Sequence, residues 1–272
     1  MNHPTSNTPL LQVNGVTVRF GGLTAVDDVS FDVHQGDLLG LIGPNGAGKT
    51  TMMRAIIGVV QPTVGSVFLG GESLNGLPIH KRIQKGMSLS QQLVRPLRDM
   101  SIQENVALAA ASDKTISPLR AFLNVSTDRE LAVAQTELAR VGIVSMASQS
   151  PSIQPLGVLK RLELARALAL KPRLLLLDEP LAGLNSQEAR ALATTIAEIN
   201  QQGLTIVLIE HNLGEVMRIC QRLVVLDNGK KIGDGDPRAV MADPFVRAAY
   251  LGGDALGASE ARGHSTLETQ RA

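Results

Sequence analysis

Apolar and polar residues alternate near the start of the chain in the manner of β-strands. The segments Leu11–Phe20 and Val26–Val33 each place an apolar residue at nearly every second position, and Pro62–Gly70 does so around Gly65. Period-two alternation predicts strands with one buried and one exposed face. These segments therefore predict an antiparallel β layer.

Other apolar runs are short and continuous, which is typical of strands buried on both faces. They are Leu39–Ile42, Leu174–Leu177 and Thr205–Ile209. Between them lie segments with helical character, some with end signals such as Gly58 after the first and Asn185 with Glu188 before a later one. The expected helices are 49–58, parts of 101–140, 159–170, 185–203 and 213–221. Strands at 223–226 and 230–232 flank the turn Asp227-Asn228-Gly229 as a hairpin. This alternation predicts an α/β fold with a mainly parallel sheet and an accessory antiparallel layer.

Composition excludes several classes of protein. Charge is balanced, with 26 Lys and Arg against 25 Asp and Glu, and aromatic residues make up only 2%. The chain thus lacks the basic and aromatic surface that single-stranded nucleic acids require, and we expect no nucleic-acid partner. No apolar stretch approaches the roughly 20 residues of a membrane span. The single cysteine, Cys220, indicates a reducing compartment, and the five histidines show no metal-ligand spacing.

A phosphate-binding loop stands directly after the apolar run Leu38–Ile42. The segment Gly43-Pro44-Asn45-Gly46-Ala47-Gly48-Lys49-Thr50, followed by Thr51, fits the pattern G-x-x-x-x-G-K-[ST] in its strand-to-helix setting. Its glycines let backbone N–H groups face an anion, beside the positive end of the next helix. Lys49 would contact the outer phosphates and Thr50 would bind Mg²⁺. A plain glycine-rich turn is the alternative.

An acidic pair follows the Leu174–Leu177 run. Asp178 leaves the buried strand where it can bind the Mg²⁺ shell, and Glu179 can polarise a water molecule as general base. A solvated acidic pair at a strand end is the alternative. Together with the phosphate loop, the pair predicts phosphoryl transfer.

Together with these motifs, the stretch from about residue 10 to residue 251 resembles the ATP-binding subunits of ABC transporters. The resemblance implies a P-loop NTPase core with a helical subdomain at about 93–170. The resemblance implies that Phe20 stacks on adenine, unless it is a strand core residue. It implies that Gln92 senses the γ-phosphate and Mg²⁺, with Gln91 as the rival, and that His211 contacts the γ-phosphate. Ala182-Gly183-Leu184-Asn185 matches the family's interface loop. Residues 1–9 would form a flexible start and 252–272 a disordered tail.

The family signature is where the sequence departs from the pattern. The helix Arg161-Leu162-Glu163-Leu164-Ala165-Arg166-Ala167-Leu168 matches, but Gln154-Pro155-Leu156-Gly157-Val158 stands in place of Leu-Ser-Gly-Gly-Gln. Pro155 has neither the N–H nor the hydroxyl that the serine would offer to a partner's γ-phosphate, which leaves Gly157, Val158 and the helix end. We therefore expect this signature to bind a partner's ATP weakly. In a heterodimer, a second ATP-binding subunit with an intact signature would complete the site built on Lys49, Asp178 and Glu179.

Three stretches are similar to the ATPases of branched-chain amino-acid importers, a group that also serves urea and amides. They are 20–31, 178–185 with Asn185, and Tyr250-Leu251-Gly252. The resemblance implies ATP and Mg²⁺ as ligands, and as partners two transmembrane permease subunits and a solute-binding protein. It places the chain at the cytoplasmic face of the inner (plasma) membrane, as a peripheral subunit.

Two alternative functions remain open. A soluble ABC ATPase of DNA repair or translation would usually carry coiled-coil insertions or a duplicated cassette, and this chain shows neither. A catalytically weak regulatory nucleotide-binding subunit is favoured only by the altered signature. Lys49, Asp178, Glu179 and His211 argue for hydrolysis.

Overall fold

The computed structural model describes residues 8–90, 96–111 and 127–250. An antiparallel sheet has the strand order β2-β1-β4-β5. Its strands are β1 (Leu11–Phe20), β2 (Leu23–Val33), β4 (Val64–Leu69) and β5 (Glu72–Ser73). The alternating segments thus form the predicted antiparallel layer, and β2 begins three residues before the predicted Val26.

A second sheet has the order β10-β9-β3-β8-β7-β6 and is parallel except for the β9–β10 hairpin. Its strands are β3 (Leu38–Ile42), β6 (Met87–Ser90), β7 (Leu174–Asp178), β8 (Thr205–Ile209), β9 (Arg222–Asp227) and β10 (Lys230–Gly235). Because β3, β7 and β8 run in the same direction, the residues that follow them emerge at one edge of the sheet.

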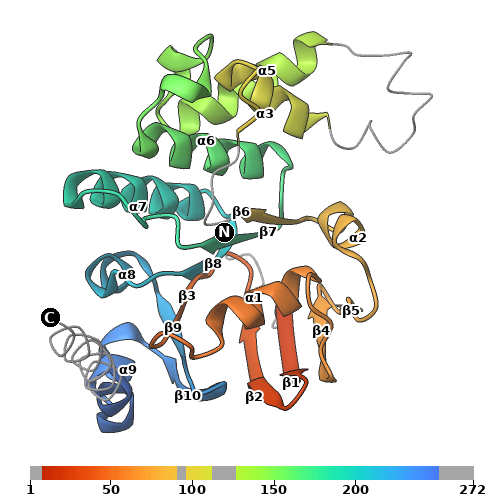
Figure 1. Ribbon diagram of the computed structural model, residues 1–272, viewed down its shortest axis with the longest axis vertical. Coiled ribbons are helices and arrows are strands. Elements are labelled where there is room, and N and C mark those ends of the chain that lie inside the picture. Colours follow the sequence, from red (N-terminus) through yellow and green to blue (C-terminus); the bar gives the residue numbers. More distant parts are fainter. Residues whose placement is uncertain (1–7, 91–95, 112–126, 251–272) are drawn as a thin grey trace, which may run out of the picture.

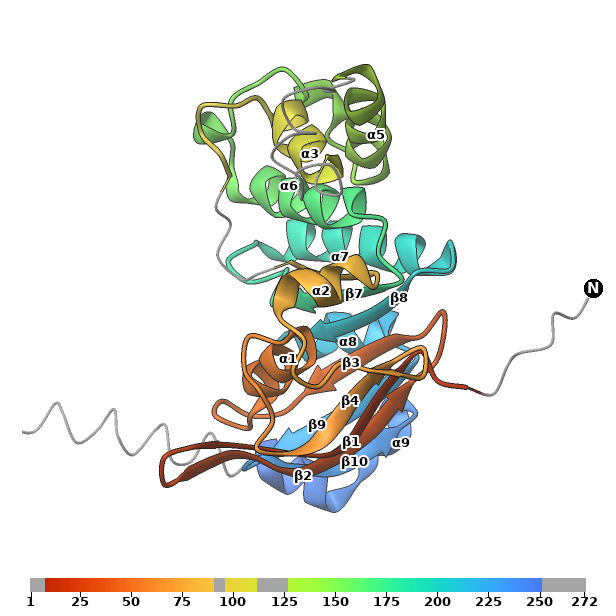
Figure 2. The same cartoon turned by 90° about the vertical axis from the view of Figure 1, so that its right-hand side faces the viewer.

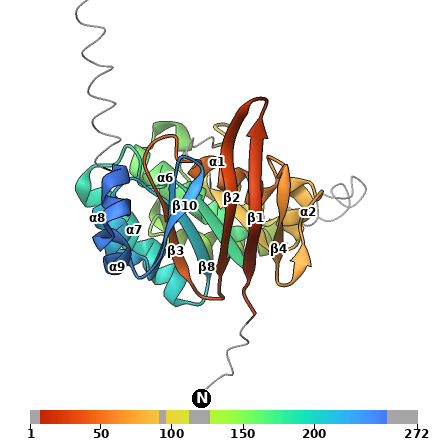
Figure 3. The ribbon, with the colours of Figure 1, turned by 90° about the horizontal axis from the view of Figure 1, so that it is seen from below.

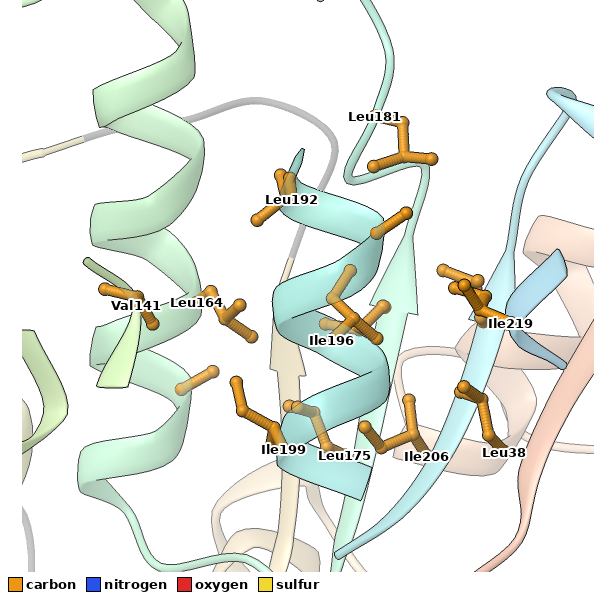
Figure 4. Packing of buried hydrophobic residues seen from close by; sticks show 14 of the residues in the cluster. Leu38, Val141, Leu164, Leu175, Leu181, Leu192, Ile196, Ile199, Ile206 and Ile219 are labelled. Carbon is orange, nitrogen blue, oxygen red and sulfur yellow. The ribbon is translucent and has the colours of Figure 1, made fainter. Parts of the chain in front are cut away.

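Two hydrophobic cores lie on opposite faces of this second sheet. Leu174 and Leu176 of β7 face the core shared with the antiparallel sheet and α1 (Lys49–Ile57), whereas Leu175 and Leu177 face the helices. Figure 4 shows the helix-side core, where Leu175 and Ile206 meet Ile196 and Ile199 of α7. The four-leucine run is therefore buried on both faces, as the sequence predicts.

The helices separate into groups (Figures 1 and 2). At one end of the molecule α3 (Ile102–Ala110), α5 (Thr127–Arg140) and α6 (Leu156–Ala169) pack together. Beside the sheet lie α7 (Ser186–Gln201) and α8 (Leu213–Ile219), and seen from below they stand on the opposite side from β1 and β4, with α9 (Pro237–Ala242) near them (Figure 3). Short helical segments complete the described fold: α2 (Ile79–Gln84), η1 (Val144–Met146) and η2 (Pro151–Ile153). Within the described ranges, every helix is too short or too polar to cross a bilayer.

Helix ends largely follow the signals in the sequence. Gly58 is the left-handed C-cap of α1, and Asn185 with Glu188 forms a reciprocal capping box at α7. The signature helix begins at Leu156, before the predicted Leu159, because Pro155 in extended conformation serves as its N-cap. Strand β6 and helices α2 and α9 were not predicted. The tail 252–272 and residues 1–7 lie outside the described residues.

Candidate functional site

The phosphate loop connects β3 to α1 and is shaped by its glycines. Gly43, Gly46 and Gly48 have φ values of 147°, 79° and 97°. A Cβ added to Gly43 would lie 2.0 Å from the Leu226 carbonyl oxygen, and one on Gly48 would lie 2.4 Å from that of Ala25. Gly48 is also the N-cap of α1, and no side chain caps this helix end. The first-turn N–H groups of α1 are thus left for an anion.

Lys49 is folded back into its own loop. Its Nζ donates to the carbonyl oxygens of Gly43 and Pro44, each at 2.8 Å, and the residue is 5% exposed. Burial lowers the pKa of the Lys49 ammonium, while the carboxylates of Glu179 and Asp178 act in the opposite direction. The two carbonyls thus hold the Lys49 ammonium within the loop. A phosphate group can replace them as its hydrogen-bond partner.

Glu179 and His211 come together from the ends of adjacent parallel strands. Glu179 Oε1 lies 2.7 Å from His211 Nε2, and the Glu179 N–H donates to the Ile209 carbonyl at 3.0 Å. Glu179 has a left-handed backbone with φ of 51°, which is unusual for a residue with a side chain. The pair supplies a carboxylate beside an imidazole, a combination that can orient a water molecule and receive its proton.

Thr50 lines the cleft described below, and Asp178 ends β7 directly before Glu179. Burial raises the pKa of Asp178, and the like charge of Glu179 raises it further. Arg54, His211 and Lys160 act in the opposite direction. A divalent cation would relieve this crowding of negative charge. A hydroxyl and a carboxylate are the oxygen ligands that Mg²⁺ prefers. In the part of the chain that is described, no cluster of three or more His, Cys, Asp or Glu side chains could hold a metal ion.

A cleft of about 470 Å³ joins these elements. Its lining includes ten of the predicted site residues: Phe20, Asn45, Gly46, Ala47, Gly48, Lys49, Thr50, Thr51, Glu179 and His211. Phe20 is 50% exposed at the rim, so the alternative of a strand core residue is wrong. Gly43 and Pro44 do not line the cleft but accept hydrogen bonds from Lys49 through their carbonyls, and Asp178 stands next to Glu179 without lining the cleft.

Five lining residues were missed by sequence reasoning. They are Leu23, Thr24, Ala25, Asn228 and Gly229. The turn of the β9–β10 hairpin packs on the phosphate loop, with the Gly229 N–H donating to the Ala47 carbonyl at 3.1 Å. The hairpin was predicted from Asp227-Asn228-Gly229, but its long-range contact with the loop has no local signal.

The altered signature lies apart from the cleft, at the start of α6. Pro155 is the N-cap, and its carbonyl accepts the N–H groups of Val158 at 3.1 Å and Leu159 at 3.2 Å. The Val158 N–H is therefore engaged within the helix turn, which leaves the N–H groups of Leu156 and Gly157 at the helix end. Ile153 and Leu156 expose 77% and 41% of their surface here. Gln92 and its rival Gln91 lie outside the described residues.

Comparison with known proteins decides the family. The family model "ABC transporter" matches residues 26–182, which is more than half of the chain. The chain belongs to the ABC transporter family. As an ABC ATPase it binds and hydrolyses ATP, and its C-terminal residues 230–255 match a second model, "Branched-chain amino acid ATP-binding cassette transporter".

Relatives are similar along nearly the whole of this ABC ATPase. The high-affinity branched-chain amino acid transport ATP-binding proteins BraF of Pseudomonas aeruginosa and LivG of Escherichia coli are each 38% identical over 90% of this chain and 98% of their own length. The lipopolysaccharide export system ATP-binding protein LptB of Acidithiobacillus ferridurans is 34% identical over 89% of this chain and 97% of its own. The ADP conformation of the ATP-binding cassette MJ1267 has a TM-score of 0.81 at 27% identity, covering 90% of this chain and 100% of that one.

Proposed function

We propose that this chain is the ATP-hydrolysing subunit of an importer for branched-chain amino acids or related small polar solutes. The supporting observation is the match of residues 230–255 to the branched-chain model, together with full-length similarity to BraF and LivG. LptB is also similar along its length, but at lower identity. The chain would sit at the cytoplasmic face of the inner membrane, bound to two permease subunits that receive solute from a solute-binding protein.

In the proposed site, ATP lies in the cleft with its adenine on Phe20. Its phosphates would replace the Gly43 and Pro44 carbonyls as partners of Lys49 and would meet the N–H groups at the start of α1. Glu179 would take the proton of the attacking water, while His211, 2.7 Å from its carboxylate, would hold that carboxylate and the γ-phosphate in line. Thr50 and Asp178 would hold Mg²⁺, which would neutralise part of the negative charge of the phosphates.

The subunit would work opposite a second, different ATP-binding subunit. Family architecture places each phosphate loop against the partner's signature, and this chain's signature has lost donors at Pro155 and Val158. Each missing charge-assisted hydrogen bond would cost roughly 1.5–3 kcal/mol at the partner's phosphates. A partner with an intact signature would complete the site built on Lys49, Asp178 and Glu179, whereas the reciprocal site would be impaired.

Single-turnover hydrolysis by the assembled dimer tests this asymmetry. Changing Glu179→Gln should remove most of the turnover, and changing the corresponding glutamate of the partner should remove little. Equal losses from both changes would contradict the asymmetric arrangement. Pro155→Ser, which restores a hydroxyl and an N–H, should raise turnover at the weak site.

Uptake into proteoliposomes tests the transport function. The full complex, with permease and solute-binding subunits, should accumulate labelled leucine, isoleucine or valine only with ATP, and Glu179→Gln should abolish accumulation. Urea and short amides serve as competitors that define the solute class. ATP hydrolysis that no permease or amino acid stimulates, or stimulation by lipopolysaccharide instead, would contradict the proposal.

A further inference from the structure

Two buried residues of opposite charge lie beside the ATP site without lining it. Lys160 of α6 is 6% exposed, and Glu210, which directly follows β8, is 4% exposed. Burial lowers the pKa of the Lys160 ammonium, and the negative charges of Glu210, Glu179, Asp178 and Glu163 act in the opposite direction. Buried ion pairs are generally no more stabilising than apolar residues of the same volume. Stability alone therefore does not account for this pair.

Lys160 holds the backbone of Glu179. Its Nζ donates to the Glu179 carbonyl oxygen at 3.1 Å, and the Ala182 N–H donates to the same oxygen at 3.2 Å. Glu179 is the residue whose left-handed backbone, with φ of 51°, turns the chain at the end of β7. Two donors thus fix the carbonyl of a sterically disfavoured turn, and this turn sets the direction in which the Glu179 side chain leaves the strand.

Glu210 joins the loop after Glu179 to the loop that carries His211. Its Oε1 accepts the Leu181 N–H at 2.6 Å, and its Oε2 accepts the His211 N–H at 3.2 Å. One carboxylate therefore fixes the backbone on both sides of the Glu179–His211 contact.

We propose that Lys160 and Glu210 are positioning residues for ATP hydrolysis, which together hold Glu179 and His211 at their working separation. Lys160 lies on the signature helix, which begins at Pro155. A displacement of this helix is thereby transmitted to the carboxylate of the same subunit, so the signature acts on its own site as well as on the partner's. This inference rests on the proposed role of Glu179 as general base.

Lys160→Met tests the proposal because methionine keeps the apolar stem and removes the donor. Steady-state hydrolysis is measured on the full chain, alone and in the complex with its partner subunits. The expected result is a fall in kcat of about tenfold or more, with KM for ATP changed less than about threefold, because misplacing a reacting group lowers turnover while the phosphate loop still binds. Lys160→Arg, which keeps a donor, should recover a large part of kcat.

Arg161→Met is the matched control on the same helix. Arg161 donates to the Val141 carbonyl at 2.7 Å and to Thr195 Oγ1 at 3.1 Å, so it joins helices and does not contact the site. This variant should lower the melting temperature while kcat stays unchanged. If Lys160→Met gives the same pattern as Arg161→Met, its role is only structural and the proposal is overturned.

Glu210→Gln and the double variant extend the test. Glutamine keeps an acceptor for Leu181 but loses the charge, so kcat should fall, and the double variant with Lys160→Met should lose less than the product of the single losses. Strictly multiplicative losses would show that the two residues act separately and would overturn their joint role. If Lys160→Met does not fold, Lys160→Gln takes its place.

Glu179→Gln, measured alongside Lys160→Met, separates the positioning proposal from the proposed role of Glu179 as general base. If it hydrolyses ATP normally, the proposed role of Glu179 fails. If it is inactive while Lys160→Met and its substitute turn over normally, the positioning proposal alone fails.

Discussion

Glu179 and His211 leave neighbouring strands β7 and β8 and meet side chain to side chain, with Oε1 and Nε2 2.7 Å apart. In the proposed mechanism the two groups act on one water molecule, so Glu179→Gln should lower kcat at least about 100-fold, and adding His211→Ala should lower it little further. Glu198→Gln, an exposed carboxylate on α7, is the control. Multiplicative losses in the double variant would show that the two residues act separately.

Lys49→Met should weaken ATP binding by roughly 10- to 100-fold, because charge-assisted hydrogen bonds to phosphate contribute about 1.5–3 kcal/mol. The measurement is a titration with a fluorescent ATP analogue. Lys81→Met, which removes an exposed lysine from α2, should bind normally. Equal affinity of the Lys49 variant and the parent would place the phosphates elsewhere.

Phe20→Ala should raise the Kd for ATP about tenfold, since stacking on an aromatic ring contributes roughly 1–3 kcal/mol. Phe20→Trp should retain or improve binding. Phe245 is 80% exposed and lies outside the cleft, so Phe245→Ala is the matched control. A loss of affinity that inorganic triphosphate shares would mean that Phe20 acts on the phosphates and not on the base.

Arg82→Met should destabilise the fold by about 2–6 kcal/mol, because two buried acceptors lose their donor. The Arg82 guanidinium is fully buried, and Nη1 donates to the carbonyls of Ala55 and Ile56 at the end of α1, both at 2.8 Å. Removing it leaves buried acceptors unpaired at about 1–3 kcal/mol each. Thermal unfolding measures the loss, with Lys81→Met on the same helix as control. An unchanged melting temperature would contradict this role.

Cys220 should resist thiol reagents up to pH 9 in the native state. Burial raises the pKa of its thiol to about 12, with a further contribution from Glu210. The unfolded thiol has a pKa of about 8.5, so the unfolded state loses its proton first and stability falls as pH rises from about 9 towards 12. A Cys220→Ser, Ser152→Cys variant, with its thiol on the exposed η2 turn, should react rapidly. Fast labelling of native Cys220 would refute its burial.

The parts of the fold that sequence patterns predict are those governed by local chemistry. Leu174–Leu177 indicates a doubly buried strand by itself, and Asn185 with Glu188 carries its own capping geometry. Strand β6 was missed because Ser88 and Ser90 are buried at the sheet edge, where alternation suggests exposure.

The same distinction holds for the site. The phosphate loop and the acidic pair are encoded in contiguous residues, so both could be predicted. Asn228 and Gly229 reach the cleft only because a hairpin distant in sequence packs on the loop. The burial of Lys160 and Glu210 likewise depends on the packing of α6 against the turn after β7 and the loop after β8. Charged residues are usually exposed, so the sequence gives no signal that these two are buried.

The uniform leucine run of β7 leaves its alignment in the sheet undetermined by hydrophobicity. A slip by one residue would exchange one leucine for another on each face, whereas in most strands it would expose the core. The alignment is instead fixed at the two ends, because a slip would move the charged Arg173 or Asp178 into a buried position of the strand. The charged residues that bound the leucine run, not the leucines themselves, thus decide how far the carboxylate of Glu179 extends beyond the sheet.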